Sequence, residues 1–254
     1  CESSYKERAR LFGEVKGWDH YDLKKLSKGG KIFLRSEKSL QLTPEIQKRF
    51  DLSKATVTPA ELIHAMLKAR TDLLYFGGIG TFIKSTVESH QDAGDRGNDS
   101  LRIDSPELRA KVIGEGANLG MTQRARIEYA QKGGRLNTDF IDNSAGVDTS
   151  DHEVNIKILL SDIVSRPKST MDVKSRNKLL SGMTDEIAGL VLRDNYQQTQ
   201  ALSLMELQAA ENLSDHASFM TSLEKSGLLN RKVEFLPDDE QIEHQPHFRV
   251  DAAA

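Results

Sequence analysis

Two short segments of small and polar residues, each placed directly after an apolar run, constrain the fold of this chain most strongly. Residues 115–118, with the sequence EGAN, follow Val112-Ile113, and residues 143–150, with the sequence NSAGVDTS, follow Ile141. An open parallel sheet binds ligands outside the carboxyl ends of its strands, where close backbone approach and a few fixed polar groups are needed. We therefore interpret both segments as strand-to-loop junctions that form one pocket.

The rest of the chain supplies the alternation that such a sheet requires. Local start and stop signals predict helices after Thr43, after Thr58 in a capping box, and after Thr122, together with a charged, helix-permissive start that closes on Gly30. Apolar runs predict strands at 31–34, 72–76, 111–114 and 135–141. The fold class predicted is α/β, a partial doubly wound (Rossmann-like) parallel sheet followed by a helical C-terminal region.

Beyond Ser150 the apolar residues recur at helical spacing and no convincing strand follows. We predict three parts: residues 1–150 as the C-terminal part of a nucleotide-binding domain, residues 151–235 as helices that pack on it, and residues 236–254 as a linker or the start of a further segment.

Length and charge exclude several classes of protein. A chain of 254 residues can bury a large core, and 35 Lys and Arg against 38 Asp and Glu give no global field that favours nucleic acid or an anionic membrane. The sole cysteine, Cys1, allows no intrachain disulfide, and no apolar run approaches the roughly 20 residues that span a bilayer. We expect a cytoplasmic protein without a metal site. The missing initiator Met and the irregular C-terminus suggest a segment of a longer polypeptide.

Three places offer ligand contacts. Gly77 and Gly78 follow a predicted buried strand, but the third glycine of the dinucleotide fingerprint is absent, and a tight turn is the alternative. Asn118 presents a donor and an acceptor beside Glu115 and Gly116, although these side chains could only tie down their own loop. Ser150 could cap a helix with Glu153 and also meet an anion at that helix N-terminus.

Other chemistry is weaker. Residues 90–99 contain one histidine and three aspartates, which could suggest a metal-dependent enzyme, but their spacing fits no known loop and a solvated polar loop is favoured. His152 has the pattern of a surface residue at a helix start. Lys84 could be a cation at the same crevice, with a solvated lysine as the alternative. No GxSxG nucleophile elbow is present.

Taken together, the ordered motifs resemble the C-terminal half of the cofactor domain of glutamate dehydrogenases. The motif KVIGEGAN at 111–118, then Thr122 and Asp139, then the segment from Asn143 to Glu153 follow that family's order and spacing, with Ala145-Gly146 where the family usually has Gly-Gly. Longer stretches, including DLLYFGGIGTFIKS, resemble the large bacterial NAD-specific glutamate dehydrogenases in particular, over most of residues 1–210.

The resemblance implies NAD as cofactor and reversible oxidative deamination of L-glutamate to 2-oxoglutarate and ammonia, in a homo-oligomeric parent. Val147 and Ser150 would face glutamate, with Ser150 bonding its side-chain carboxylate. The implied cofactor-binding residues are Gly77, Gly78, Glu115, Gly116, Asn118 and Asn143.

The family's glycine-rich first turn and its catalytic lysine and aspartate find no counterpart in this sequence. We therefore assign no catalytic residue and predict that the isolated chain has no dehydrogenase activity, because binding groups alone supply no base. The alternative function is a noncatalytic ligand-binding or interaction module with the same crevice.

Overall fold

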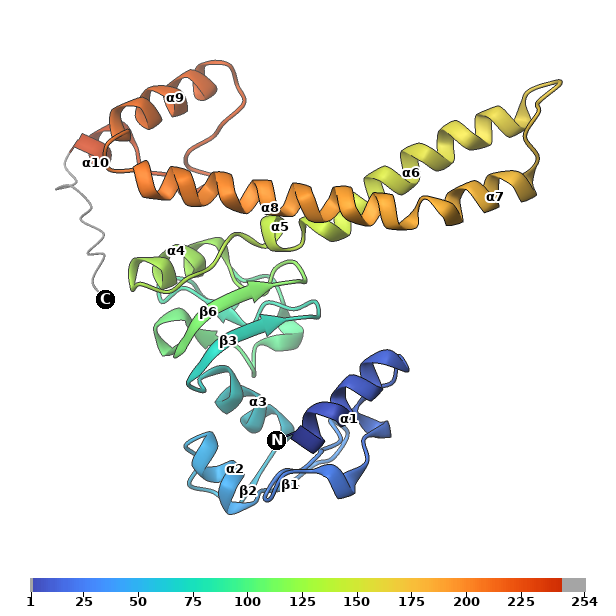
Figure 1. Ribbon diagram of the computed structural model, residues 1–254. Helices are drawn as coiled ribbons and strands as arrows, with labels where there is room; N and C mark the ends of the chain where they lie inside the picture. The colour runs from blue at the N-terminus through green and yellow to red at the C-terminus, as the bar shows by residue number, and fades with distance from the viewer. Residues whose placement is uncertain (1, 244–254) are drawn as a thin grey trace. The chain divides into compact units, whose positions relative to one another are not determined.

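The computed structural model describes residues 2–243, which form two compact units (Figure 1). The first unit comprises residues 2–75, 80–113 and 120–136, and the second comprises residues 76–79, 114–119 and 137–243. The chain passes between the units inside two strands, β3 and β6. No helix in the described part of the chain is long and apolar enough to cross a membrane.

The first unit mixes short helices with short strands. Its elements in chain order are α1 (Glu2–Gly13), η1 (Trp18–His20), η2 (Leu23–Lys25), β1 (Leu40–Gln41), α2 (Pro44–Arg49), β2 (Thr56–Val57), α3 (Pro59–Leu67), β3 (Thr71–Phe76), β4 (Ile83–Lys84), η3 (Arg96–Asn98), β5 (Ile103–Asp104), η4 (Ser105–Glu107), β6 (Ala110–Glu115) and α4 (Gln123–Gln131).

Three two-stranded sheets connect these elements. β1 pairs antiparallel with β2, and β4 pairs parallel with β5. β3 pairs with β6, and Figure 1 draws the two strands as neighbouring arrows that point the same way. The described residues therefore form an α/β fold with small parallel sheets, as predicted at the level of fold class.

The local helix signals are confirmed. Thr43, Thr58 and Thr122 each accept a hydrogen bond from a backbone amide in the first turn of the helix that follows. Thr58 also forms the predicted capping box with Glu61. These contacts span three residues, so the sequence alone specifies them.

Two predicted strands are wrong. Residues 31–34 form no strand; Phe33 instead packs against a buried cluster of Leu40, Leu42, Val57 and Leu62 that β1 and β2 hold together. In the predicted strand 135–141, Arg135 makes one parallel bridge to Val112, and a helix has already begun at Asp139. An apolar run that serves packing from a loop or a short helix has the same composition as a strand, so composition cannot separate them.

Two further expectations need correction. The first helix ends at Gly13 rather than near Gly30. The strand β3 forms as predicted, but it is not buried, because Leu73 and Tyr75 are 54% and 63% exposed.

The second unit is helical. It contains α5 (Asp139–Asp142), α6 (Ser144–Ser165), α7 (Val173–Gly182), α8 (Thr184–Gln208), α9 (Leu213–Lys225) and α10 (Asp239–Glu243). α6 packs along α8, with Leu160 and Val191 buried (Figure 1). The helices predicted after residue 150 are confirmed. The predicted linker at 236–254 contains α10, and its residues 244–254 lie outside the described residues.

Candidate functional site

The end of β6 is joined to the end of β3 by a backbone hydrogen bond. The Ala117 amide donates to the Phe76 carbonyl over 3.0 Å, so the loop after β6 lies beside the residues that follow β3. Phe76 and Glu115 are buried, whereas Gly77, Gly78 and Asn118 are exposed. The loops after these two neighbouring strands therefore present their polar and small residues together, as the sequence predicts.

Two carboxylates from α5 hold the loop after β6. The Glu115 amide donates to Oδ2 of Asp142 over 2.9 Å, and the Leu119 amide donates to Oδ2 of Asp139 over 2.8 Å. Leu119 has φ +67°, a left-handed conformation that leucine rarely adopts and that its bond to Asp139 helps to fix. Asp139 also accepts from the amide of Phe140 over 2.9 Å, which starts α5. This positioning role of α5 was missed from the sequence, where the same residues were assigned to a strand.

The carboxamides of Asn118 and Asn143 meet directly. Nδ2 of Asn143 donates to Oδ1 of Asn118, which joins the loop after β6 to the residue that precedes α6. Gly146 makes room for this arrangement, because a Cβ at that position would lie 2.8 Å from Oδ1 of Asn143. The structure thus brings together the two amides that the sequence places in one pocket.

The second polar segment is not a strand-to-loop junction, and that prediction is wrong. Asn143 precedes α6, and residues 144–150 form the first two turns of that helix. Val147 and Ser150 are exposed on α6, and Ser150 lies in the second turn, so it is not the predicted N-cap and does not face unpaired amides. The helix begins earlier because α5 and α6 follow each other with Asn143 alone between them.

Gly77 and Gly78 lie in the open part of this site. A Cβ added at Gly78 would meet no atom within 4 Å, so the packing of the protein does not require a glycine there. Small residues in such a place leave the backbone accessible to a ligand. Together the residues offer exposed amides, a hydroxyl and bare backbone, a set suited to binding a polar ligand.

Two other candidates are occupied by protein contacts in the first unit. Lys84 is buried rather than solvated, and its ammonium group pairs with Asp104. In the loop of residues 90–99, the buried guanidinium of Arg102 contacts Nδ1 of His90 at 2.9 Å and Oδ1 of Asp99 at 2.6 Å. The loop is therefore an ordered charge network around an arginine, which accounts for its polar residues without a metal ion.

The fold and these contacts define an α/β protein with a polar site at the ends of two neighbouring strands. Comparison with known proteins gives the family. The model of the family described as bacterial NAD-glutamate dehydrogenase, catalytic domain, matches residues 1–205. This chain belongs to that family.

Three relatives, each named NAD-specific glutamate dehydrogenase, show the extent of the match. The protein of Pseudomonas aeruginosa is 55% identical over 241 residues, that of Halomonas elongata 50% over 241 residues, and that of Mycobacterium tuberculosis 44% over 246 residues. Each match covers 94% of this chain and 15% of the relative. The chain thus spans about 15% of the length of these relatives, consistent with a segment of a large enzyme.

Proposed function

We propose that this chain forms part of the NAD and glutamate site of an NAD-dependent glutamate dehydrogenase. The reaction is oxidative deamination of L-glutamate to 2-oxoglutarate and ammonia. The observation that carries the proposal is the Asn118 and Asn143 pair, which α5 and the end of β6 hold at an exposed strand end within a family named for NAD and glutamate.

The residues present fit a dinucleotide. The Asn118 and Asn143 carboxamides use one donor and one acceptor on each other, and each retains groups that can bond a nicotinamide carboxamide or a ribose hydroxyl. The backbone at Gly78 is open, so a flat ring can approach it closely. Gly77, Glu115 and Gly116 complete the proposed cofactor contacts. When bound, NAD accepts the hydride; these residues bind and orient it.

Glutamate is proposed to lie against the exposed face of the first two turns of α6. Val147 contacts its carbon chain, and the hydroxyl of Ser150 donates to its side-chain carboxylate, since a hydroxyl bonds a carboxylate without carrying charge itself. The proposal gives this chain binding and orientation, and assigns proton transfer to none of these residues.

The proposal also concerns architecture and assembly. Residues 1–150 would contribute to a doubly wound, Rossmann-like cofactor domain, residues 151–235 to a helical region that packs on it, and residues 236–254 to a linker or the start of the next segment. We further propose that the parent enzyme is a homo-oligomer.

The test is a separation of cofactor and substrate binding in a full-length dehydrogenase that carries this sequence. Asn118→Ala is expected to raise the Kd of NADH about tenfold, because a neutral hydrogen bond contributes about 1 kcal/mol. Ser150→Ala is expected to raise the KM of glutamate ten- to a hundredfold, since a hydrogen bond to a charged group contributes about 1.5–3 kcal/mol.

Asn155→Ala is the matched control. Asn155 is exposed on α6, and its amide donates to the helix carbonyl of Asp151 over 2.8 Å. This variant should leave both constants unchanged. Equal effects of all three substitutions, or a Ser150→Ala variant with wild-type KM for glutamate, would contradict the proposal.

A further inference from the structure

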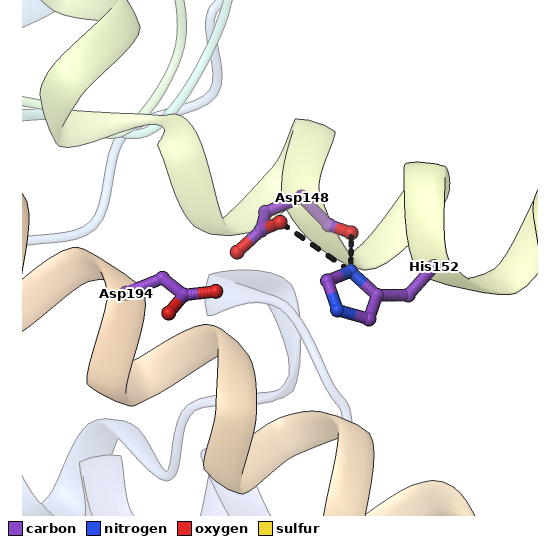
Figure 2. Close-up of side chains that lie close together, drawn as sticks. All are labelled: Asp148, His152 and Asp194. Carbon is purple, nitrogen blue, oxygen red and sulfur yellow. Dashed lines mark hydrogen bonds and ion pairs between the residues drawn. The ribbon is translucent and has the colours of Figure 1, made fainter.

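A cluster of three potential metal ligands lies between α6 and α8. Asp148 and His152 are one turn apart on α6, and Asp194 extends from α8 toward them (Figure 2). One ligand atom from each residue lies within 4.8 Å of the other two, and all three side chains are half-buried. Nearby, Oγ of Ser144 donates to Oδ1 of Asn195 over 2.7 Å, which fixes the two helices beside the cluster.

The two carboxylates lack protein partners that would balance their charge. Oδ2 of Asp148 is buried and has no hydrogen-bond partner. Asp194 makes no hydrogen bond or ion pair with any residue between 2 and 243. Carboxylates this close repel each other, and a buried carboxylate oxygen without a partner is unfavourable. A cation between them would remove both costs.

The imidazole of His152 is already oriented as in a metal site. Nδ1 lies 2.8 Å from the backbone carbonyl oxygen of Asp148. Because a carbonyl oxygen only accepts, Nδ1 carries the proton, and in the neutral ring Nε2 holds the free lone pair. Metal-bound histidines characteristically donate their other ring N–H to a carbonyl or carboxylate in this way. Figure 2 shows the second ring nitrogen on the side of the ring that faces Asp194.

The donor set indicates the class of ion. Mg²⁺ and Ca²⁺ prefer oxygen ligands, whereas imidazole suits Zn²⁺ and its first-row neighbours. Ligands at about 2.1 Å in a tetrahedral site lie about 3.4 Å apart, so small rotations of these half-exposed side chains suffice to close the site.

We propose that Asp148, His152 and Asp194 bind one divalent first-row transition-metal ion, with Zn²⁺ as its representative. The ion links α6 to α8 at the turn of α6 that carries Val147 and Ser150. This site requires neither NAD nor glutamate, so it stands or falls separately from the proposed function.

The test measures Zn²⁺ binding to the intact, chelator-stripped protein by competition with a chromophoric chelator. Other histidines can also bind Zn²⁺, so the decisive quantity is the difference between variants. Wild type is expected to bind one equivalent more than Asp194→Asn, or to bind that equivalent at least tenfold more tightly. Equimolar Mg²⁺ is expected not to compete for it.

Thermal unfolding distinguishes a lost ligand from a misfolded protein. Metal-free Asp194→Asn is expected to unfold at or above the wild-type Tm, because the substitution removes a repulsion, and Zn²⁺ should raise the Tm of wild type alone. His152→Gln should behave likewise toward Zn²⁺.

Asp185→Asn is the matched control for charge, since Asp185 is exposed near the start of the same helix α8. It should retain the wild-type equivalent of Zn²⁺. The proposal is overturned if Asp194→Asn and His152→Gln bind Zn²⁺ as wild type does, if Mg²⁺ competes equally, or if wild type binds no Zn²⁺.

Discussion

At the scale of single residues, Gly146 permits the contact on which the candidate site depends. A methyl group there would lie 2.8 Å from Oδ1 of Asn143, at the end of a side chain that can rotate away. Gly146→Ala is therefore expected to leave the Tm within a few degrees of wild type while it breaks the Asn118 and Asn143 hydrogen bond. The side-chain amide signals of both asparagines in ¹H–¹⁵N spectra measure this directly, and the Kd of NADH should rise.

Gly182→Ala is the control for that substitution, because a Cβ there would meet nothing within 4 Å. It should leave the amide signals of Asn118 and Asn143 in place. Unchanged amide signals in Gly146→Ala would show that the glycine has no part in holding the pair.

The candidate site shows what residue patterns can reveal. Asn118 and Asn143 could be placed near each other from the sequence, because each follows an apolar run in the order expected of adjacent strand ends. Their support could not. The Leu119 amide bonds Asp139 across 20 residues, and no local pattern encodes a contact of that span. The burial of Lys84 beside Asp104 is likewise a product of strand pairing between β4 and β5.

At the scale of elements, the start of α3 depends on pH. Hydrogen bonds from Thr58 and Lys54 lower the pKa of Glu61 from 4.5 to about 2. The folded-state pKa lies below the unfolded value, so the stabilisation is present above about pH 4.5 and is lost as the pH falls toward 2. Glu61→Gln should lower the free energy of unfolding at pH 7, and the difference from wild type should shrink across that window.

Denaturant unfolding of both proteins at several pH values measures this difference. Glu211→Gln removes an exposed carboxylate elsewhere and should show no comparable change with pH. A Glu61→Gln difference that stayed constant down to pH 2 would rule out the carboxylate as its source.

Two glycines with open space around them test backbone conformation alone. Gly189 lies inside α8 and Gly133 follows α4 with φ +84°, and a Cβ at either would meet nothing within 4 Å. Gly189→Ala should stabilise the protein by about 0.8–1 kcal/mol, through helix propensity. Gly133→Ala should destabilise it by about 1 kcal/mol, because alanine resists positive φ. Equilibrium unfolding measures both, and effects of the same sign would contradict the assignment.

The elements also show why some boundaries are readable. Helix starts at Thr43, Thr58 and Thr122 depend on side chains that bond within their own turn, so sequence suffices. The segment 135–141 has an apolar pattern compatible with a strand, but Asp139 and Asp142 serve a neighbouring loop from a short helix. Long-range hydrogen bonding, not propensity, selects that outcome.

At the scale of the whole molecule, one face of the β3 and β6 pair is apolar and exposed. Leu73, Tyr75 and Val112 are 54%, 63% and 41% exposed, while Ile113 on the opposite side is buried. Parallel sheets are normally covered on both faces. Because this chain matches only 15% of the length of its relatives, we expect another part of the longer polypeptide to cover this face in those proteins.

The paired substitution Leu73→Thr with Tyr75→Thr tests this expectation in two settings. In the 254-residue chain, both side chains are already in solvent, so the free energy of unfolding should change by less than about 0.5 kcal/mol. In a full-length relative, the equivalent change should cost about 2–4 kcal/mol, since two apolar side chains lose their burial. Val87→Thr is the control, at another exposed β-branched position. Equal changes in the two settings would show that this face stays in solvent in the full-length enzyme.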